Sequence, residues 1–344
     1  GHYPFSHTLE ELMPFFVLHE ERARQIILDQ DRPTYHILQD QFKVDPLRVA
    51  NVIDYKNAQC SIPPEDLLLA NILSGTLDPD KIDYLLRDSL FCGVPFGESV
   101  NRDRLESSIK YDSERKRLAI TSKGVDAVEA LVFTNYLMYR NVYWHHGVRS
   151  ASAMFKRAVQ EILLHPECQL DGNRFHLLTE SELIAQLKSE QQRLQLTGSA
   201  QLLDGTIYRR LYKVGAVINP SERKRALMEY LYELFHNPVK RREKEIELCH
   251  MFSKKLGRPL SGHEILIDIP GFNKSPEVDL KVFYGPKNPS DKADPLTFDN
   301  PEVTRLRDSL LDNFEDQAKI FRIFCIDDPQ LRTLVRNEAK RYLN

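Results

Sequence analysis

The sequence predicts a mainly helical fold with a small β-hairpin and a mixed α+β C-terminal region. A long run with apolar residues at helical spacing, 125–164, contains no proline. Two short β-rich runs, 107–111 and 117–121, flank a polar stretch and predict the hairpin. The chain has 344 residues, of which 42% are hydrophobic and 28% charged, a composition typical of globular proteins. This length suffices for one large domain or two ordinary ones.

Helices are expected in the first third of the chain. Residues 10–30 show helical spacing that Pro14 interrupts. Residues 66–74 predict a helix that stops at Gly75. The next helix has signals at both ends, because Asp78-Pro79-Asp80 can cap its start and Gly93 follows its end. We expect it to run from residue 81 to about residue 91.

The later elements follow from the same signals. The run 125–164 predicts one long helix or two stacked ones, with Gly147 as a break. Further helices are expected at 179–196, 221–236 and 328–343. Strands are expected at 264–269, 278–283 and 319–326, the last with one wet face, and residues 284–300 predict an exposed loop.

Bulk composition argues against several classes of protein. The net charge is −3, so nothing indicates a nucleic acid partner. The cysteines have no CxxC spacing, which favours reduced thiols over disulfides or a zinc knuckle. We find no apolar run of about 18 residues, and therefore expect a cytoplasmic protein with no membrane partner.

The first group of candidate residues lies at the beginning of the chain. It consists of His2, His7, Glu10 and His19. A neutral imidazole binds divalent metals and carries protons near pH 7. Glu10 lies three positions after His7 and can orient its ring from the same helical face. The alternative is that these histidines are surface residues or remnants of a tag.

The second group lies on the helix expected after residue 80. It consists of Asp80, Lys81, Tyr84 and Asp88. Their spacing places carboxylates, an ammonium and a phenol along one groove of the helix. A carboxylate suits a divalent metal that also binds phosphate, and a lysine can neutralise phosphate charge. The alternative is a charged surface helix with ion pairs such as Asp83 with Arg87.

The third group lies between residues 139 and 149, where aromatic residues alternate with His and Arg. Arg140 could clamp a phosphate and Tyr143 could stack on a base. The neighbouring His145 and His146 would point about 100° apart on one helix, so we do not assign them to a metal. The alternative is a buried aromatic helix with a polar edge.

Three segments, in order, resemble the dNTP triphosphohydrolase branch of the HD-domain metal phosphohydrolases. Gly-His-Tyr-Pro-Phe-Ser-His-Thr-Leu-Glu at 1–10 is similar to the second half of the motif on the family's active-site helix. Residues 80–93 resemble the family's Asp-x-x-Asp-Tyr-x-x-Arg-Asp-x-x-x-x-Gly run. Residues 138–146 resemble its Arg-x-x-Tyr-x-His helix, and weaker likeness continues near 208–213 and Leu266. The resemblance therefore covers most of the chain and implies a helical HD-domain core.

The resemblance also implies roles for the candidate residues near the phosphates. Asp80 would be the final metal ligand. His7, supported by Glu10, would protonate the leaving group or position the attacking water. His2 and His19 would contact the phosphates or the bridging oxygen.

On the substrate side, Lys81 and, with less support, Arg140 would bind phosphate. Tyr84 and Asp88 would hold the sugar, and Tyr143 would pack on the nucleoside. The cofactor would be a divalent metal: Mg, Mn or a transition ion such as Fe or Ni. The reaction would convert a dNTP to a deoxynucleoside and triphosphate.

The resemblance further implies that the His-Asp pair and an earlier His lie upstream of Gly1, so we expect a chain truncated just after that pair. The expected parts are an HD-type catalytic core (1–165), a helical extension (166–262) and an α+β region (263–344). A homo-oligomer and a nucleotide activator are also expected. Two alternatives stay open: an HD phosphohydrolase for another nucleotide or phosphate ester, and a non-catalytic scaffold that binds nucleotides or a partner.

Overall fold

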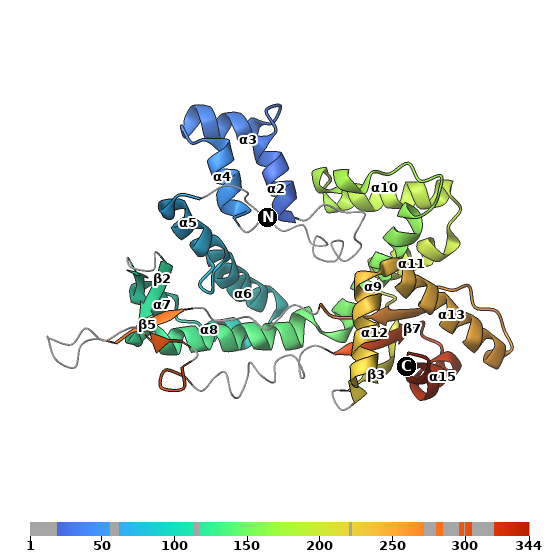
Figure 1. Ribbon diagram of the computed structural model, residues 1–344. Coiled ribbons are helices and arrows are strands. Elements are labelled where there is room, and N and C mark those ends of the chain that lie inside the picture. The colour runs from blue at the N-terminus through green and yellow to red at the C-terminus, as the bar shows by residue number, and fades with distance from the viewer. Residues whose placement is uncertain are drawn as a thin grey trace. The chain divides into compact units, whose positions relative to one another are not determined.

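The computed structural model describes residues 19–55, 62–112, 117–219, 222–271, 280–284, 296–298, 300–304 and 320–343. The chain forms two compact units, which we name after their central helices. The α6 unit comprises 19–142 and 273–318, and the α9 unit comprises 1–18, 143–272 and 319–344. Helices dominate the described residues, as Figure 1 shows, and the predicted mainly helical class is confirmed.

The α6 unit consists mostly of helices with one small sheet. Its helices are α2 (His19–Leu28), α3 (Pro33–His36), η1 (Ile37–Gln41), α4 (Pro46–Ile53), α5 (Pro64–Ser74), α6 (Pro79–Cys92), η2 (Pro95–Ser99), α7 (Arg102–Ser108), η3 (Ser122–Gly124) and α8 (Val125–Met138). Its strands are β1 (Ile109–Asp112), β2 (Arg117–Thr121), β5 (Lys281–Phe283) and β6 (Leu296–Thr297), in the order β1-β2-β5-β6.

The predicted hairpin is present, since β1 and β2 pair antiparallel. Its first strand starts later than expected, because Ser107 and Ser108 belong to α7. Asn101 accepts a hydrogen bond from the Arg104 N–H at 3.0 Å and so caps that helix. β5 then adds to β2 in parallel, which joins a late segment of the chain to the hairpin.

Helix α6 follows its sequence signals closely. Asp78 caps the first turn, Pro79 occupies the first helical position, and Gly93 ends the helix with φ of 66°. This left-handed conformation suits glycine. Ser89 lies on the buried side of α6, and its hydroxyl accepts the Gly97 N–H at 2.8 Å. A Cβ at residue 97 would lie 2.8 Å from the Ser89 Cβ, so the close packing of α6 on η2 requires a glycine there.

The long run 125–164 forms two helices with a π-helical segment between them. Helix α8 ends at Met138, η4 covers Tyr139–Tyr143, and α9 begins at His146. Gly147 is not the break, because it lies in the first turn of α9. The backbone leaves the helical region at His145 (φ −56°, ψ 139°), whose ring accepts the Gly147 N–H at 3.2 Å.

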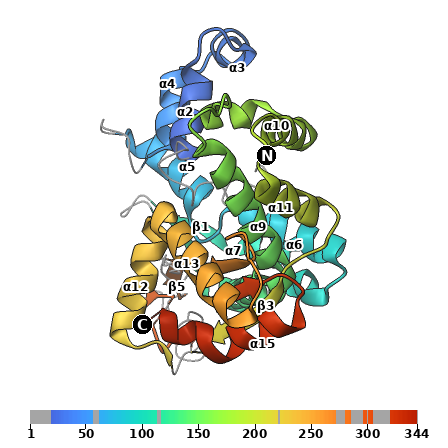
Figure 2. The same cartoon turned by 90° about the vertical axis from the view of Figure 1, so that its right-hand side faces the viewer.

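The α9 unit places helices around a three-stranded sheet. Its helices are α9 (His146–Leu163), η5 (Gly172–Leu177), α10 (Glu180–Arg193), α11 (Thr197–Ile207), α12 (Arg225–His236), α13 (Pro238–Leu256), α15 (Pro329–Glu338) and η8 (Ala339–Tyr342). Its strands, β3 (Lys213–Ile218), β4 (Ile265–Asp268) and β7 (Phe321–Cys325), pair antiparallel in the order β3-β7-β4. Figure 2 shows this unit from a second side.

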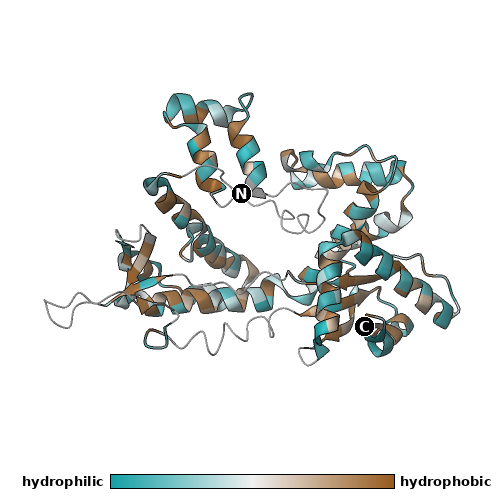
Figure 3. Cartoon of the chain, in the orientation of Figure 1, coloured by the Kyte–Doolittle hydropathy of each residue, from teal (hydrophilic) through white to brown (hydrophobic). Residues whose placement is uncertain are grey.

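Strand β7 corrects one prediction. We expected a wet face along 319–326, yet all five residues of β7 are buried. Phe321 and Ile323 pack in one hydrophobic cluster and Phe324 in another, because β7 is the central strand with helices on both faces. Figure 3 shows hydrophobic residues along the strands of this unit. Arg322 of this strand is buried next to charged groups.

Four elements of the α9 unit were not expected from the sequence: η5, α11, β3 and α13. Helix α12 ends at His236 as predicted, but Asn237 starts α13 at once. The Asn237 side chain accepts the Lys240 N–H at 2.9 Å and caps that helix. The three predicted ranges, 1–165, 166–262 and 263–344, stay a prediction.

Two further observations concern the described residues. None of their helices is long and apolar enough to cross a membrane. Cys92, Cys168, Cys249 and Cys325 are all free thiols, as the sequence predicted for them.

Candidate functional site

The first turn of α6 presents Asp80 to solvent. Its backbone N–H donates to Asp78 Oδ1 at 2.8 Å, so the cap fixes the start of the helix. Burial raises the pKa of Asp78, mainly because its carboxylate loses water. Asp80 itself is exposed, and an acidic side chain in the first turn is favoured by the helix dipole.

Lys81 is half-buried, and its ammonium group is turned back toward the loop before α6. It donates to the carbonyl oxygens of Gly75 at 3.3 Å and Thr76 at 3.4 Å. Burial lowers the pKa of this lysine, while the nearby Asp78 opposes the shift. The ammonium group therefore has weak, long contacts that a phosphate group could replace.

Tyr84 connects α6 to the third group of candidates. Its phenol interacts with that of Tyr139, the first residue of η4, and this interaction contributes to the raised pKa of Tyr84. Burial raises the pKa of both phenols, so both stay protonated near neutral pH. The structure thus brings together two segments that the sequence proposed separately.

Asp88 lies one turn beyond Tyr84 and accepts a hydrogen bond from Arg87 Nη1 at 3.2 Å. The same guanidinium donates from Nε to Asp83 at 3.1 Å. The intrahelical ion pair between Asp83 and Arg87, which we listed as the alternative for this helix, is therefore present. It lies on the exposed side and leaves the half-buried side to Lys81, Tyr84 and Asp88.

The π-helical segment η4 carries Arg140 and Tyr143. Arg140 donates to the Tyr136 hydroxyl at 3.0 Å, and its guanidinium carbon lies 5.9 Å from the centre of that ring. Tyr143 is the first residue of the α9 unit. π-Helical segments inside α-helices are frequent at functional sites.

The ring centres of His145 and His146 lie 4.1 Å apart, and burial lowers the pKa of His146.

The N-terminal candidates fall largely outside the described residues. This holds for His2, His7 and Glu10. His19 opens α2, and only its backbone is described. The roles that the resemblance implies for these four residues stay predictions.

The donors of the described residues fit a divalent metal only in part. The exposed carboxylate of Asp80 is a hard oxygen donor of the kind that such an ion prefers. No three His, Cys, Asp or Glu side chains of the described ranges are grouped so as to hold a metal. One carboxylate is a poor site by itself, so these residues alone do not make a metal centre.

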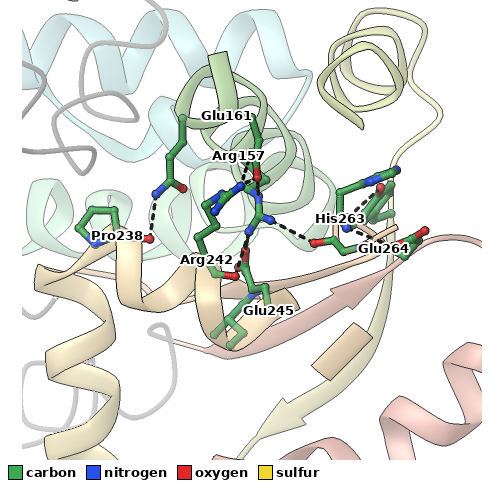
Figure 4. Close-up of polar contacts among 11 residues, drawn as sticks. Arg157, Glu161, Pro238, Arg242, Glu245, His263 and Glu264 are labelled. Carbon is green, nitrogen blue, oxygen red and sulfur yellow. Dashed lines mark hydrogen bonds and ion pairs between the residues drawn. The ribbon is translucent and has the colours of Figure 1, made fainter. Parts of the chain in front are cut away.

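A second polar group lies inside the α9 unit and is shown in Figure 4. We call Arg157, Glu161, Arg242 and Glu245 the Arg157 cluster. Arg157 donates from Nε to Glu161 at 2.7 Å, from Nη1 to Glu245 and from Nη2 to the Gly262 carbonyl at 3.0 Å. Arg242 binds the Glu161 carboxylate with two nitrogens, each at 2.7 Å. The cluster therefore ties α9 to α13 and to the loop before β4.

Glu245 also accepts a backbone hydrogen bond at the outer edge of the sheet. Its Oε1 accepts the Ile267 N–H of β4 at 2.7 Å, on the side where no other described strand pairs with β4. Burial raises the pKa of Glu245, although the positive charges of Arg157 and Arg241 act in the opposite direction.

Next to Glu245, Asp268 accepts hydrogen bonds from Arg149 Nε at 3.0 Å and Nη2 at 2.5 Å. Arg149 and Asp268 are both buried, so α9 is joined to β4 by a second ion pair.

The sequence reading missed this buried cluster. One signal was available, since Lys156, Arg157 and Glu161 interrupt an apolar run predicted to be helical. Their partners were not visible, because Arg157 and Glu245 are 88 positions apart.

Comparisons with known proteins agree with the helical fold. Residues 100–288, more than half of the chain, match the family described as the HD associated region. A hypothetical protein from Aquifex aeolicus superposes with a TM-score of 0.64 at 22% identity, covering 100% of this chain and 77% of that one. A phosphohydrolase from Bacteroides thetaiotaomicron gives 0.61 at 20% identity, covering 95% and 76%.

Two curated relatives match parts of the sequence. The uncharacterized protein MJ1154 of Methanocaldococcus jannaschii is 34% identical over 160 residues, 46% of this chain and 31% of that protein. The uncharacterized protein YwfO of Bacillus subtilis is 32% identical over 172 residues, 49% of this chain and 35% of that protein. The matched region thus spans about a third of each relative.

These findings define a mainly helical protein whose fold is similar to that of the Bacteroides thetaiotaomicron protein. The chain belongs to the HD-associated-region family. The family match and the fold support the predicted place in the HD-domain superfamily.

Proposed function

We propose that this protein is a metal-dependent phosphohydrolase that converts dNTPs to deoxynucleosides and triphosphate. The observation that carries the proposal is the interaction between the phenols of Tyr84 and Tyr139. It joins α6, with its carboxylates and lysine, to the π-helical segment that carries Arg140. The fold of the Bacteroides thetaiotaomicron phosphohydrolase supports a hydrolase of this general type.

In this proposal, the side chains of α6 contact different parts of the substrate. Lys81 would exchange its long contacts with the Gly75 and Thr76 carbonyls for phosphate oxygens. The protonated phenol of Tyr84 and the carboxylate of Asp88 would hold the sugar hydroxyl groups. Arg140 would add a phosphate contact from η4, and Tyr143 would pack on the nucleoside.

The acid–base and metal roles come from the resemblance. The leaving group would be protonated, or the attacking water positioned, by His7 with the support of Glu10. The phosphates or the bridging oxygen would be contacted by His2 and His19. Asp80 would be one ligand of the metal. A bound Mg, Mn, Fe or Ni ion would polarise a phosphoryl oxygen and lower the pKa of bound water.

The test is product analysis with the complete protein. Each of the four dNTPs is incubated with Mn²⁺ or Mg²⁺, and the products are separated by anion-exchange chromatography. The proposal expects free triphosphate and deoxynucleoside in equal amounts. Orthophosphate or pyrophosphate as the product would favour the alternative of another HD phosphohydrolase. Nucleotide binding without turnover would favour the non-catalytic scaffold.

The remaining expectations accompany this proposal. We propose a homo-oligomer, a nucleotide activator and a cytoplasmic location. Light scattering with and without added nucleotide would test the first two together, because an activator that binds between subunits changes the oligomer population.

A further inference from the structure

A pocket of about 240 Å³ lies within the α9 unit, where α11 begins. Its wall includes the first turn of α11 (residues 197–199), the loop 261–263 and the side chains of Arg157 and Arg242. One water molecule needs only about 10–15 Å³ of such space, so the pocket has room for a group of several heavy atoms. None of the candidate residues on α6 and η4 lines it.

Helix α11 begins without a side-chain cap. Its N-cap residue is Leu196, whose apolar side chain cannot accept a hydrogen bond, whereas α10 begins with a capping box formed by Thr179 and Glu182. Within the described part of the chain, the N–H groups of Gly198 and Ser199 donate to no acceptor. Free N–H groups at the start of a helix, together with the helix dipole, favour a bound anion.

The hydroxyl group of Ser199 also lacks an acceptor. Ser199 is only 1% exposed, and its Oγ has no hydrogen-bond partner among the residues that the structure describes. Because Cα–Cβ bonds tilt toward the N-terminus of a helix, this side chain points toward the turn that carries the free N–H groups. A buried hydroxyl without a partner costs free energy, which a ligand that accepts its proton would recover. Three donors at the start of α11 are thus available to one ligand.

The charged side chains of the pocket favour an anion as well. Its lining has two guanidinium groups, Arg157 and Arg242, against one carboxylate, Glu161. Both Glu161 oxygens already accept hydrogen bonds at 2.7 Å, from the Nε atoms of both arginines on Oε1 and from Arg242 Nη2 on Oε2 (Figure 4). These bonds leave Nη1 of Arg242 for a ligand. His263 also lines the pocket, and burial lowers its pKa, which favours a neutral ring near pH 7.

We propose that this pocket binds a phosphate group at the start of α11. The N–H groups of Gly198 and Ser199 and the Ser199 hydroxyl donate to its oxygens, and Arg242 lies beside its negative charge. A tetrahedral oxyanion suits the pocket because it offers a separate oxygen to each donor and fills space that a monatomic ion would leave empty. This inference does not rest on the proposed hydrolase activity.

Arsenate provides a direct test, since it has the geometry and charge of phosphate and scatters anomalously. Crystals of the full chain are soaked in arsenate, and data are collected at the arsenic absorption edge. We expect an anomalous peak beside the backbone nitrogens of Gly198 and Ser199, with arsenate oxygens within hydrogen-bond distance of them. Arsenate bound elsewhere in the crystal, with none at the start of α11, would overturn the proposal.

Calorimetric titration with inorganic phosphate tests the site in solution. Ser199→Ala removes one hydrogen bond to a charged group, so the Kd for phosphate should rise roughly tenfold. Ser181→Ala is the matched control, because it removes an exposed hydroxyl from the first turn of α10, and it should leave the Kd unchanged. An unchanged Kd in Ser199→Ala would contradict the proposal.

Thermal unfolding checks that the variant is folded and that the ion binds in this unit. Ser199→Ala removes a buried hydroxyl without a partner, so its Tm in the absence of phosphate should equal or exceed that of the wild type. Added phosphate should raise Tm more in the wild type than in the variant. A phosphate effect that is lost in Lys81→Met and kept in Ser199→Ala would place the ion on α6 and overturn the proposal.

A phosphate ester distinguishes the two sources of such a group. Deoxyadenosine monophosphate is titrated into the wild type and into Ser199→Ala alongside inorganic phosphate. A similar loss of affinity for both ligands in the variant would support a pocket that accepts esters. A loss for inorganic phosphate alone would support a pocket for the free ion.

Discussion

The phenols of Tyr84 on α6 and Tyr139 on η4 interact, and burial raises the pKa of both. This contact links two segments that are 55 positions apart in the sequence (139 minus 84). It gives the candidate site of the α6 unit a rigid connection between its carboxylate-bearing helix and its π-helical segment.

This contact can be measured with a double-mutant cycle. Tyr84→Phe and Tyr139→Phe each remove one hydroxyl, and each should lower the free energy of unfolding by about 1 kcal/mol. The double variant should lose less than the sum, with a coupling of about 0.5–1.5 kcal/mol. Tyr111→Phe, at an exposed position of β1, should change little. Simple additivity of the two single variants in urea unfolding would show that the hydroxyl groups do not interact.

Asp80 is the described residue on which the metal proposal depends. Asp80→Ala should reduce kcat/KM of the complete protein by more than about 100-fold and leave Tm nearly unchanged, since its side chain is exposed. Asp83→Ala is the matched control on the same helix, because it removes a carboxylate that only pairs with Arg87 at the surface. Full activity of the Asp80 variant would remove this residue from the ligand set.

Arg157 and Glu245 should be strongly coupled in stability. Arg157→Met leaves the Glu245 carboxylate buried without its cation, and we expect a loss of about 3–5 kcal/mol in the free energy of unfolding. The double variant Arg157→Met with Glu245→Leu should recover part of that loss, because the Glu245 carboxylate is then no longer buried without Arg157. Recovery should be incomplete, since the Ile267 N–H then lacks its acceptor. Urea unfolding of Arg157→Met, Glu245→Leu and the double variant shows whether the two side chains contribute to stability independently.

Glu190 should make stability depend on pH in the acid range. Hydrogen bonds from Arg193 at 2.6 and 2.9 Å, helped by the Gln169 N–H, lower the pKa of Glu190 to about 2. A carboxyl group whose pKa is lower in the folded state stabilises above its unfolded pKa of about 4.3 and loses this contribution as pH falls. The stability difference between wild type and Glu190→Gln should therefore be constant above about pH 5 and shrink toward about pH 2. The free energy of unfolding of the two proteins is measured in urea from pH 7 to pH 2.5. A difference between them that stays constant over this range would contradict the lowered pKa of Glu190.

The sequence alone determined the elements whose signals are local. Helix α6 was predictable because its cap, its first-turn proline and its terminal glycine all lie within the helix or next to it. The same holds for the stop of α12 at Asn237 and for the placement of Lys81, Tyr84 and Asp88 on one helix. Helical geometry fixes which side chains share a face, so the grouping needed no knowledge of the rest of the fold.

Only the tertiary structure decided what surrounds each side chain. The alternating pattern of β7 predicted a wet face, but a central strand covered on both sides buries even Arg322. The orientation of Lys81 toward the Gly75 and Thr76 carbonyls depends on the path of the preceding loop. The pairing of Arg157 with Glu245 arises where α9 and α13 meet. Such contacts join residues distant in sequence, and local spacing carries no information about which of them will meet.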